Sequence, residues 1–117
     1  MKILYVSSEV TPFAKTGGLA DVAQALPEAL RALGHDVRTV TPKYLSVAEQ
    51  DIAMDPMASF TVQMHNGLQR AGLLQAQNGS VPTYFLENDA YFNREGFYGL
   101  GDGDYPDNLE RLSLIHI

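Results

Sequence analysis

The residues best suited to chemistry are one lysine and two glycines in the segment Lys15-Thr16-Gly17-Gly18-Leu19. A lysine ammonium is a mobile point charge that can reach a phosphate, and glycines let a ligand approach the backbone closely. If a helix begins after Gly18, its unpaired N–H groups and partial positive charge also favour an anion. The segment therefore predicts an anion site, although a tight turn with a solvated lysine is the other interpretation of the same residues.

Two standard phosphate loops do not fit this segment. A Walker loop places its lysine after the glycines, whereas Lys15 comes before them. A dinucleotide fingerprint needs a third glycine and a carboxylate near the end of the second strand. That strand is expected to end at Thr39-Val40-Thr41-Pro42, which has no carboxylate, so NAD binding is disfavoured.

The elements around the lysine segment predict a βαβ unit over residues 2–41. An apolar run over 2–7 is typical of a buried parallel strand, and residues 35–41 supply the second strand. Between them, a helix is expected over 19–33, with one apolar stripe: Leu19, Val22, Ala23, Leu26, Leu30 and Leu33. We expect Pro27 to kink this helix or divide it into two abutting helices, and Gly34 to cap it. The lysine segment then lies at the carboxyl end of the first strand, where open α/β sheets bind ligands.

The pattern changes after residue 52. Apolar and polar residues alternate over 60–64, and Asn66-Gly67 and Asn78-Gly79 are hairpin turn signals between short strands. We expect antiparallel hairpins over about 57–87, in a mixed sheet or as a β insertion, and a short helix within 44–50. The fold class predicted is therefore α/β, with a βαβ start followed by antiparallel hairpins.

Residues 87–111 are predicted to be rich in loops, with a helix beginning near Pro106-Asp107-Asn108-Leu109. Aromatic residues are interleaved there: Tyr91, Phe92, Phe97, Tyr98 and Tyr105. Their rings could form a lid or an edge that binds sugars, or they could pin the loop to the core. Both interpretations stay open at this level.

Composition excludes several classes of protein. The chain has 117 residues, a formal net charge of −6 and a sequence pI of about 4.8, which argues against nucleic-acid and anionic-membrane partners. It has no cysteine, and His35, His65 and His116 lack the spacing of a metal-ligand pair. No metal site or cofactor is expected. The first apolar run is too short for a signal peptide, so a cytoplasmic protein is the expectation.

Longer motifs resemble the N-terminal signature of bacterial glycogen synthases and plant starch synthases. They run from residue 1 to about 111: Ser7-Ser8-Glu9-Val10-x-Pro12-Phe13-x-Lys15-Thr16-Gly17-Gly18-Leu19-Ala20-Asp21-Val22, Ala25-Leu26-Pro27-x-Ala29-Leu30, Gly34-His35-Asp36-Val37, Arg94-Glu95-Gly96-x-Tyr98-Gly99 and Asp107-Asn108-x-x-Arg111. The resemblance implies the Rossmann-like N-terminal part of a two-domain glycosyltransferase. Such an enzyme transfers glucose from ADP-glucose to the non-reducing end of an α-1,4-glucan, with retention of configuration.

The same resemblance implies roles for particular residues. Lys15 matches a lysine that contacts ADP-glucose, and Gly17 and Gly18 match a loop whose backbone faces the donor phosphates. Asp21 and Glu9 match positions near the donor and acceptor cleft. Tyr98 matches a tyrosine near the active site, and it can equally be a loop anchor. The main catalytic groups would lie outside these 117 residues, so they stay unknown.

The expected domain organisation is an incomplete N-terminal catalytic domain over 1–111. Residues 112–117 depart from the family pattern, and we expect them to be a truncated or non-native tail. The chain alone is then expected to be inactive. Two alternatives remain: another sugar-nucleotide transferase of the same architecture, or a non-enzymatic α/β binding module.

Overall fold

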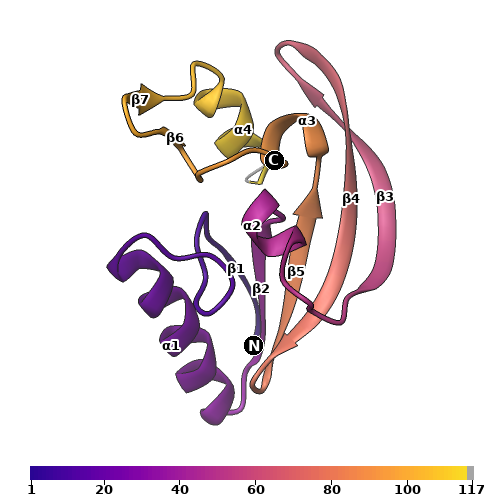
Figure 1. Cartoon of the computed structure of the whole chain (residues 1–117). Coiled ribbons are helices and arrows are strands. Elements are labelled where there is room, and N and C mark those ends of the chain that lie inside the picture. Colours follow the sequence, from indigo (N-terminus) through magenta and orange to yellow (C-terminus); the bar gives the residue numbers. More distant parts are fainter. Residues whose placement is uncertain (116–117) are drawn as a thin grey trace.

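The computed structural model describes residues 1–115, and it confirms the α/β fold (Figure 1). His116 and Ile117, the end of the expected tail, lie outside the described residues. The elements are β1 (Lys2–Val6), α1 (Gly18–Ala32), β2 (Asp36–Pro42), α2 (Leu45–Ala48), β3 (Asp55–Met64), β4 (Gly67–Asn78), β5 (Val81–Glu87), α3 (Asp89–Phe92), β6 (Gly99–Leu100), β7 (Gly103–Asp104) and α4 (Asn108–Leu114).

One mixed five-stranded sheet has the strand order β1-β2-β5-β4-β3. β1, β2 and β5 are parallel, whereas β4 runs antiparallel to both β5 and β3. The expected βαβ unit and the hairpins are both confirmed. β5 pairs with β2 of the βαβ unit and with β4 of the hairpins, so all five strands belong to one sheet. Glycines at positive φ make the two hairpin turns: Gly67 at 111° and Gly79 at 59°.

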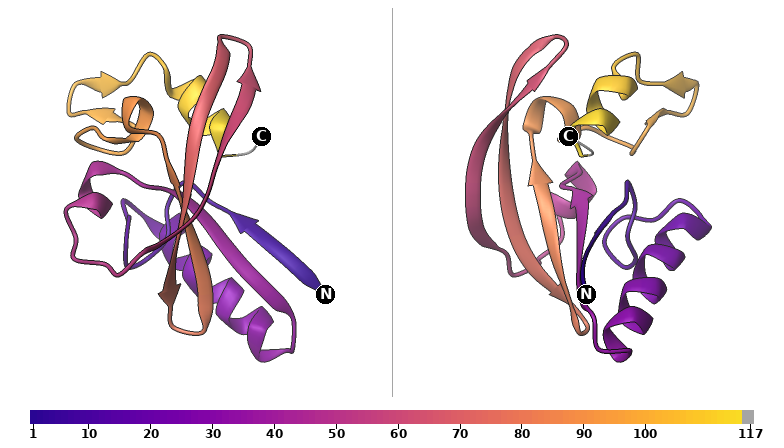
Figure 2. Two further views of the ribbon diagram at one scale, coloured as in Figure 1. Left: turned by 90° about the vertical axis from the view of Figure 1, so that its right-hand side faces the viewer. Right: turned by 180° about the vertical axis from the view of Figure 1, so that it is seen from behind.

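Helix α1 packs on one face of the sheet through small residues rather than through its large apolar ones (Figure 2). Its buried residues are Ala20, Ala23 and Pro27. Of the expected stripe, Leu19, Val22, Leu26 and Leu33 are exposed. The helix is continuous through Pro27, so the division into two abutting helices is wrong, and the alternative of a kink stays a prediction. Small side chains let the helix axis approach the sheet closely, and this leaves the longer side chains on the outer side.

The two faces of the parallel strands are unequally covered. Val37, Thr39, Thr41, Thr83 and Phe85 lie on the face under α1 and the 7–17 loop, and all are buried. On the other face, Leu4 is 60% exposed, and α4 covers part of the surface through Leu114 and Ile115. The expectation that residues 2–7 form a buried strand is therefore wrong. β1 is parallel but forms an edge of the sheet, and no element of residues 1–115 lies over Leu4.

The region after β5 contains more regular structure than expected. Asn88 caps α3, its side chain accepting a hydrogen bond from the Tyr91 N–H at 3.1 Å. Tyr91 and Phe92 are buried in the core, and Phe97 stacks on Tyr44 with ring centroids 4.7 Å apart. These three rings therefore pin the segment to the core. The expected helix near residue 108 is confirmed as α4, which begins after Asp107.

Candidate functional site

Most of the residues predicted from the sequence to form the site gather at the carboxyl ends of the parallel strands. In Figure 1 these ends point toward α2, α3 and the β6–β7 hairpin. Ser7, Ser8 and Glu9 follow β1, and Lys43 and Tyr44 follow β2. The 15–17 segment leads directly into α1. Since the strands are parallel, residues far apart in the sequence meet along this one edge.

Lys15 and Asp21 form an exposed ion pair. The Lys15 Nζ lies 2.8 Å from both carboxylate oxygens of Asp21, and the two side chains are 50% and 55% exposed. Thr11 donates a further hydrogen bond to the Asp21 carboxylate at 3.0 Å. The hydrogen bond from Lys15, and then that from Thr11, lowers the pKa of Asp21. The Lys15 side chain thus lies at the surface, beside the start of α1.

The glycine pair at the start of α1 is not required by the fold. Gly17 is the N-cap residue with extended backbone, and neither Gly17 nor Gly18 has a positive φ. A Cβ at either position would meet no atom within 4 Å. Because neither backbone conformation nor packing demands glycine, the open space beside this backbone is available to a ligand.

Glu9 lies behind the lysine segment and is only 2% exposed. Its carboxylate accepts hydrogen bonds from the Thr16 hydroxyl, from the Thr16 backbone N–H at 3.4 Å and from the Tyr98 hydroxyl at 3.0 Å. None of the ion pairs within residues 1–115 includes Glu9. Glu9 is therefore a buried carboxylate held by hydroxyl and amide donors.

Tyr98 is hydrogen-bonded to residues that follow β1, and Tyr44, which follows β2, binds one of them. Its hydroxyl lies 2.9 Å from the Ser8 hydroxyl, and Tyr44 donates to the Ser8 carbonyl oxygen at 2.8 Å. Burial raises the pKa of Tyr98, and it raises that of Tyr44 well above its usual range. Both phenols stay protonated, so Tyr98 can donate to Glu9 while it accepts from Ser8. Of the predicted residues, Glu9 and Tyr98 are in contact, and so are Lys15 and Asp21.

The 95–106 loop that carries Tyr98 is closed at its base. Arg94 binds both carboxylate oxygens of Asp107 at 2.7 Å, and Asn108 donates to the Tyr98 carbonyl oxygen at 2.6 Å. The guanidinium of the buried Arg111 lies 4.9 Å from the ring centre of Tyr105. These contacts fix where the loop presents Tyr98.

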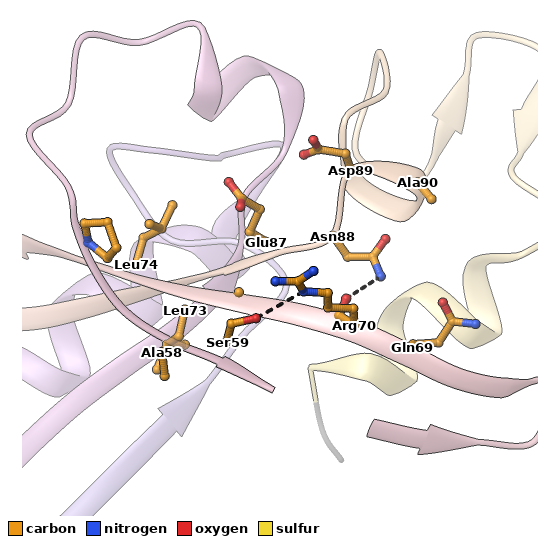
Figure 3. A pocket seen from close by; sticks show the side chains of 12 residues that line it. Ala58, Ser59, Gln69, Arg70, Leu73, Leu74, Glu87, Asn88, Asp89 and Ala90 are labelled. Atoms are coloured by element: carbon orange, nitrogen blue, oxygen red, sulfur yellow. Dashed lines mark hydrogen bonds between the residues drawn. The ribbon is translucent and has the colours of Figure 1, made fainter. Parts of the chain in front are cut away.

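A cavity of about 590 Å³ lies elsewhere, over β3, β4 and the end of β5 (Figure 3). Its walls include Arg70, which donates a hydrogen bond to Ser59, together with Glu87 and Asp89. None of the residues predicted from the sequence to form a site lines this cavity. The candidate site is instead an open surface at the strand ends.

Comparison with known proteins identifies the family of this chain. A family model described as the starch synthase catalytic domain matches residues 2–116. The chain belongs to the starch synthase catalytic domain family. It is 51% identical to a glycogen synthase of Syntrophotalea carbinolica and 46% identical to glycogen synthase 2 of Geobacter sulfurreducens, over 98% of this chain in both.

A solved structure of the same family has a similar fold. It is the catalytic domain of starch synthase IV from Arabidopsis thaliana bound to ADP and acarbose, with a TM-score of 0.74 and 26% identity. That match covers 86% of this chain and 21% of the other. The chain spans 24% of the length of the two glycogen synthases, about a quarter. It therefore corresponds to one part of a longer family fold.

Sequence reasoning missed three residues that organise this site: Ser8, Thr16 and Tyr44. The family motif contains Ser8 and Thr16, and Tyr44 could have been found because it follows a parallel strand.

Within residues 1–115, no group of three or more His, Cys, Asp or Glu residues could hold a metal ion. No helix in that range is long and apolar enough to cross a membrane.

Proposed function

We propose that this chain supplies part of the donor site of an enzyme that transfers glucose from ADP-glucose to the non-reducing end of an α-1,4-glucan, with retention. The observation that carries the proposal is the segment of residues 15–18, called the donor loop below. It combines an exposed lysine, a glycine pair with open space beside it and the first turn of a 15-residue helix. These features suit a diphosphate, because backbone N–H groups and an ammonium can both bind its oxygens.

The relatives support this choice of reaction and donor. Those cited above are glycogen synthases, and the structural neighbour binds ADP and acarbose. Acarbose is an oligosaccharide analogue, which is consistent with a glucan acceptor. We extend both partners to this chain on the strength of family membership and the donor loop. The proposal includes no metal or other cofactor.

The chemistry explains why the donor loop is built this way. As the glycosidic bond of ADP-glucose breaks, negative charge develops on the departing ADP. Fixed N–H groups and an ammonium aimed at that charge lower the energy of the transition state. We assign this role to Lys15 and to the backbone of Gly17 and Gly18. We place Asp21 and Glu9 near the donor and acceptor cleft, and Tyr98 near the active site.

The donor loop is open to solvent, whereas charge stabilisation is strongest where water is excluded. We therefore propose that the rest of a longer protein forms the opposite wall of the site and holds the main catalytic groups. The 117-residue chain alone should show no glucosyl transfer. Cytoplasmic location is part of the same proposal, since both substrates would be intracellular.

The test is Lys15→Ala in a full-length enzyme that carries this segment. A hydrogen bond to a charged group contributes about 1.5–3 kcal/mol, so kcat/KM for ADP-glucose should fall roughly ten- to a hundredfold. Lys15→Arg should restore only part of this activity, because a planar guanidinium does not replace a compact ammonium. Steady-state kinetics with each substrate varied in turn measures both effects.

Lys2→Ala is the matched control, since Lys2 is an exposed lysine at the other end of β1. It should leave both constants unchanged. The dependence on glucan concentration should also change little in Lys15→Ala. Unchanged donor constants in a folded Lys15→Ala enzyme would remove the lysine from the site. A wild-type enzyme that uses another sugar nucleotide, or none, would overturn the proposed function.

A further inference from the structure

The donor loop has few restraints of its own. Gly17, the N-cap residue of α1, makes no side-chain capping bond, and no atom would contact a Cβ at Gly17 or Gly18. Glycine also loses more conformational freedom on ordering than any other residue. The position of this backbone must therefore be fixed by neighbouring side chains.

Two contacts on opposite sides of the loop provide that restraint. On the exposed side, Lys15 is bound to Asp21 at 2.8 Å. On the buried side, the hydroxyl of Thr16 donates to a carboxylate oxygen of Glu9, and its backbone N–H lies 3.4 Å from the other oxygen. Thr16 lies between Lys15 and the glycine pair in the sequence, so a contact that fixes Thr16 also restrains the backbone of its neighbours.

Donor binding weakens the exposed contact. A phosphate that takes up the Lys15 ammonium competes directly with the Asp21 carboxylate for the same three N–H donors. The contact between Thr16 and Glu9 ends on a carboxylate that is 2% exposed and does not involve the lysine, so a phosphate bound to Lys15 leaves it intact. It is then the restraint that keeps the backbone N–H groups of the loop aimed at the phosphates.

Glu9 is a rigid support for this purpose. Its carboxylate is buried and is also held by Tyr98, which in turn contacts Ser8 at 2.9 Å. Ser8 is fixed by Tyr44 at 2.8 Å. Hydrogen bonds to a buried charge are stronger than neutral ones, because little water competes for the carboxylate.

We propose that Thr16 is a positioning residue for the donor phosphates and acts through the carboxylate of Glu9. This inference rests on the proposed function. It assigns Thr16 a role in binding without contact with the donor. It also gives Glu9 a new role, as the fixed base of the donor loop.

The test compares Thr16→Val and Thr16→Ser in the full-length enzyme, with ADP binding measured by calorimetry beside steady-state kinetics. Valine keeps the shape and loses the hydroxyl, so ADP should bind about tenfold more weakly. Serine keeps the hydroxyl and should bind ADP within about threefold of wild type. Thr61→Val, at an exposed threonine of β3, is the matched control and should change nothing.

The Thr16→Val substitution in a Glu9→Ala enzyme tests whether Thr16 acts through Glu9. In a Glu9→Ala enzyme, adding Thr16→Val should weaken ADP binding by less than about twofold, because the acceptor is already gone. An equal loss in both backgrounds would overturn the inference, as would unchanged ADP binding in Thr16→Val or the same loss in Thr16→Ser. If Thr16→Val does not fold, Tyr98→Phe removes another donor to the same carboxylate and should also weaken ADP binding; unchanged binding there would overturn the inference.

Wild-type activity separates this inference from the function on which it rests. An enzyme that transfers no glucose from ADP-glucose contradicts the proposed function, whatever the Thr16 variants do. An active wild type whose Thr16 variants all bind ADP equally contradicts only the positioning role.

Discussion

At the scale of single residues, two carboxylates near Lys15 have opposite surroundings. Asp21 is exposed and paired with a cation, whereas Glu9 is buried and held by hydroxyl groups and one amide. An exposed ion pair contributes little to stability, so Asp21 can release its lysine at low cost. A buried carboxylate that loses its donors is costly, so Glu9 should keep Thr16.

The glycine pair gives a prediction that separates stability from binding. Gly18→Ala should leave the melting temperature unchanged or raise it, because alanine in a helix is favoured over glycine by up to about 1 kcal/mol and its Cβ has open space. The new methyl group should keep a phosphate away from the backbone and raise the KM for ADP-glucose about tenfold. Thermal melts and donor kinetics measure the two effects.

Gly101→Ala is the control for this prediction. Gly101 also has open space around it, and it lies in the turn between β6 and β7, outside the donor loop. It should leave the donor KM unchanged. An unaltered KM in Gly18→Ala would show that no ligand approaches this backbone.

Individual site residues were only partly predictable from the sequence. The motif identified Lys15 and the glycine pair because their residue types suit phosphate chemistry. It could not show that Lys15 binds Asp21, or that Glu9 is buried. Both depend on how the 7–17 loop folds back against α1, which no local pattern specifies.

At the scale of elements, the 95–106 loop is closed by an ion pair between the residues that flank it, Arg94 and Asp107. This ion pair is bidentate, and the two side chains are each about 30% exposed. The hydrogen bond with Arg94 lowers the pKa of Asp107. Burial lowers the pKa of Arg111 beside it, with a contribution from Arg94. The ion pair thus orders the loop that presents Tyr98.

This ion pair predicts a dependence of loop order on pH. The pKa of Asp107 is lower in the folded state, so the ion pair stabilises the loop fully well above the ordinary carboxyl pKa of about 4, and this stabilisation is lost progressively as the pH falls from there through the lowered pKa. Asp107→Asn should lower the hydrogen-exchange protection of residues 95–106 at pH 7. At pH 3.5 the difference between variant and wild type should narrow.

Asp102→Asn is the control for that measurement, because Asp102 lies in the same loop and none of the ion pairs found in residues 1–115 involves it. It should not change protection at either pH. Equal protection in Asp107→Asn and wild type at pH 7 would show that the ion pair does not order the loop.

The elements were predicted better than their orientations. Alternation, Asn-Gly turns and helical spacing correctly indicated β1 to β5 and α1. They could not indicate which side of α1 faces the sheet. Three small residues, Ala20, Ala23 and Pro27, pack there because close approach of helix and sheet outweighs the burial of larger side chains.

At the scale of the whole molecule, one face of the sheet is only partly covered. A groove of about 350 Å³ runs over that face, lined by Leu4, Val6, Val40, Phe60, Val62, Leu73, Tyr84, Leu86, Leu114 and Ile115. Parallel sheets in α/β proteins are normally covered on both faces. The sequence could indicate the parallel strands, but it could not show which face the 117 residues leave open.

This open face predicts the behaviour of the 117-residue chain alone. We expect it to be poorly soluble or molten, since an uncovered apolar patch favours aggregation. It should bind a hydrophobic dye and melt without a sharp transition. Replacing Leu4 and Phe60, which are 60% and 41% exposed, by threonine should improve solubility. A sharp cooperative melt with well-dispersed NMR signals would contradict the expectation.

The pairing of Lys15 with Asp21 also affects which anions can reach the lysine. The two opposite charges are 2.8 Å apart and largely cancel at longer range, so the surface around the pair is nearly neutral. A small free anion must displace Asp21 and has only a few contacts with which to do so. A sugar nucleotide reaches many more groups at once. Under the proposed function, the Asp21 carboxylate is therefore a competitor for Lys15 that inorganic phosphate displaces less readily than a sugar nucleotide does.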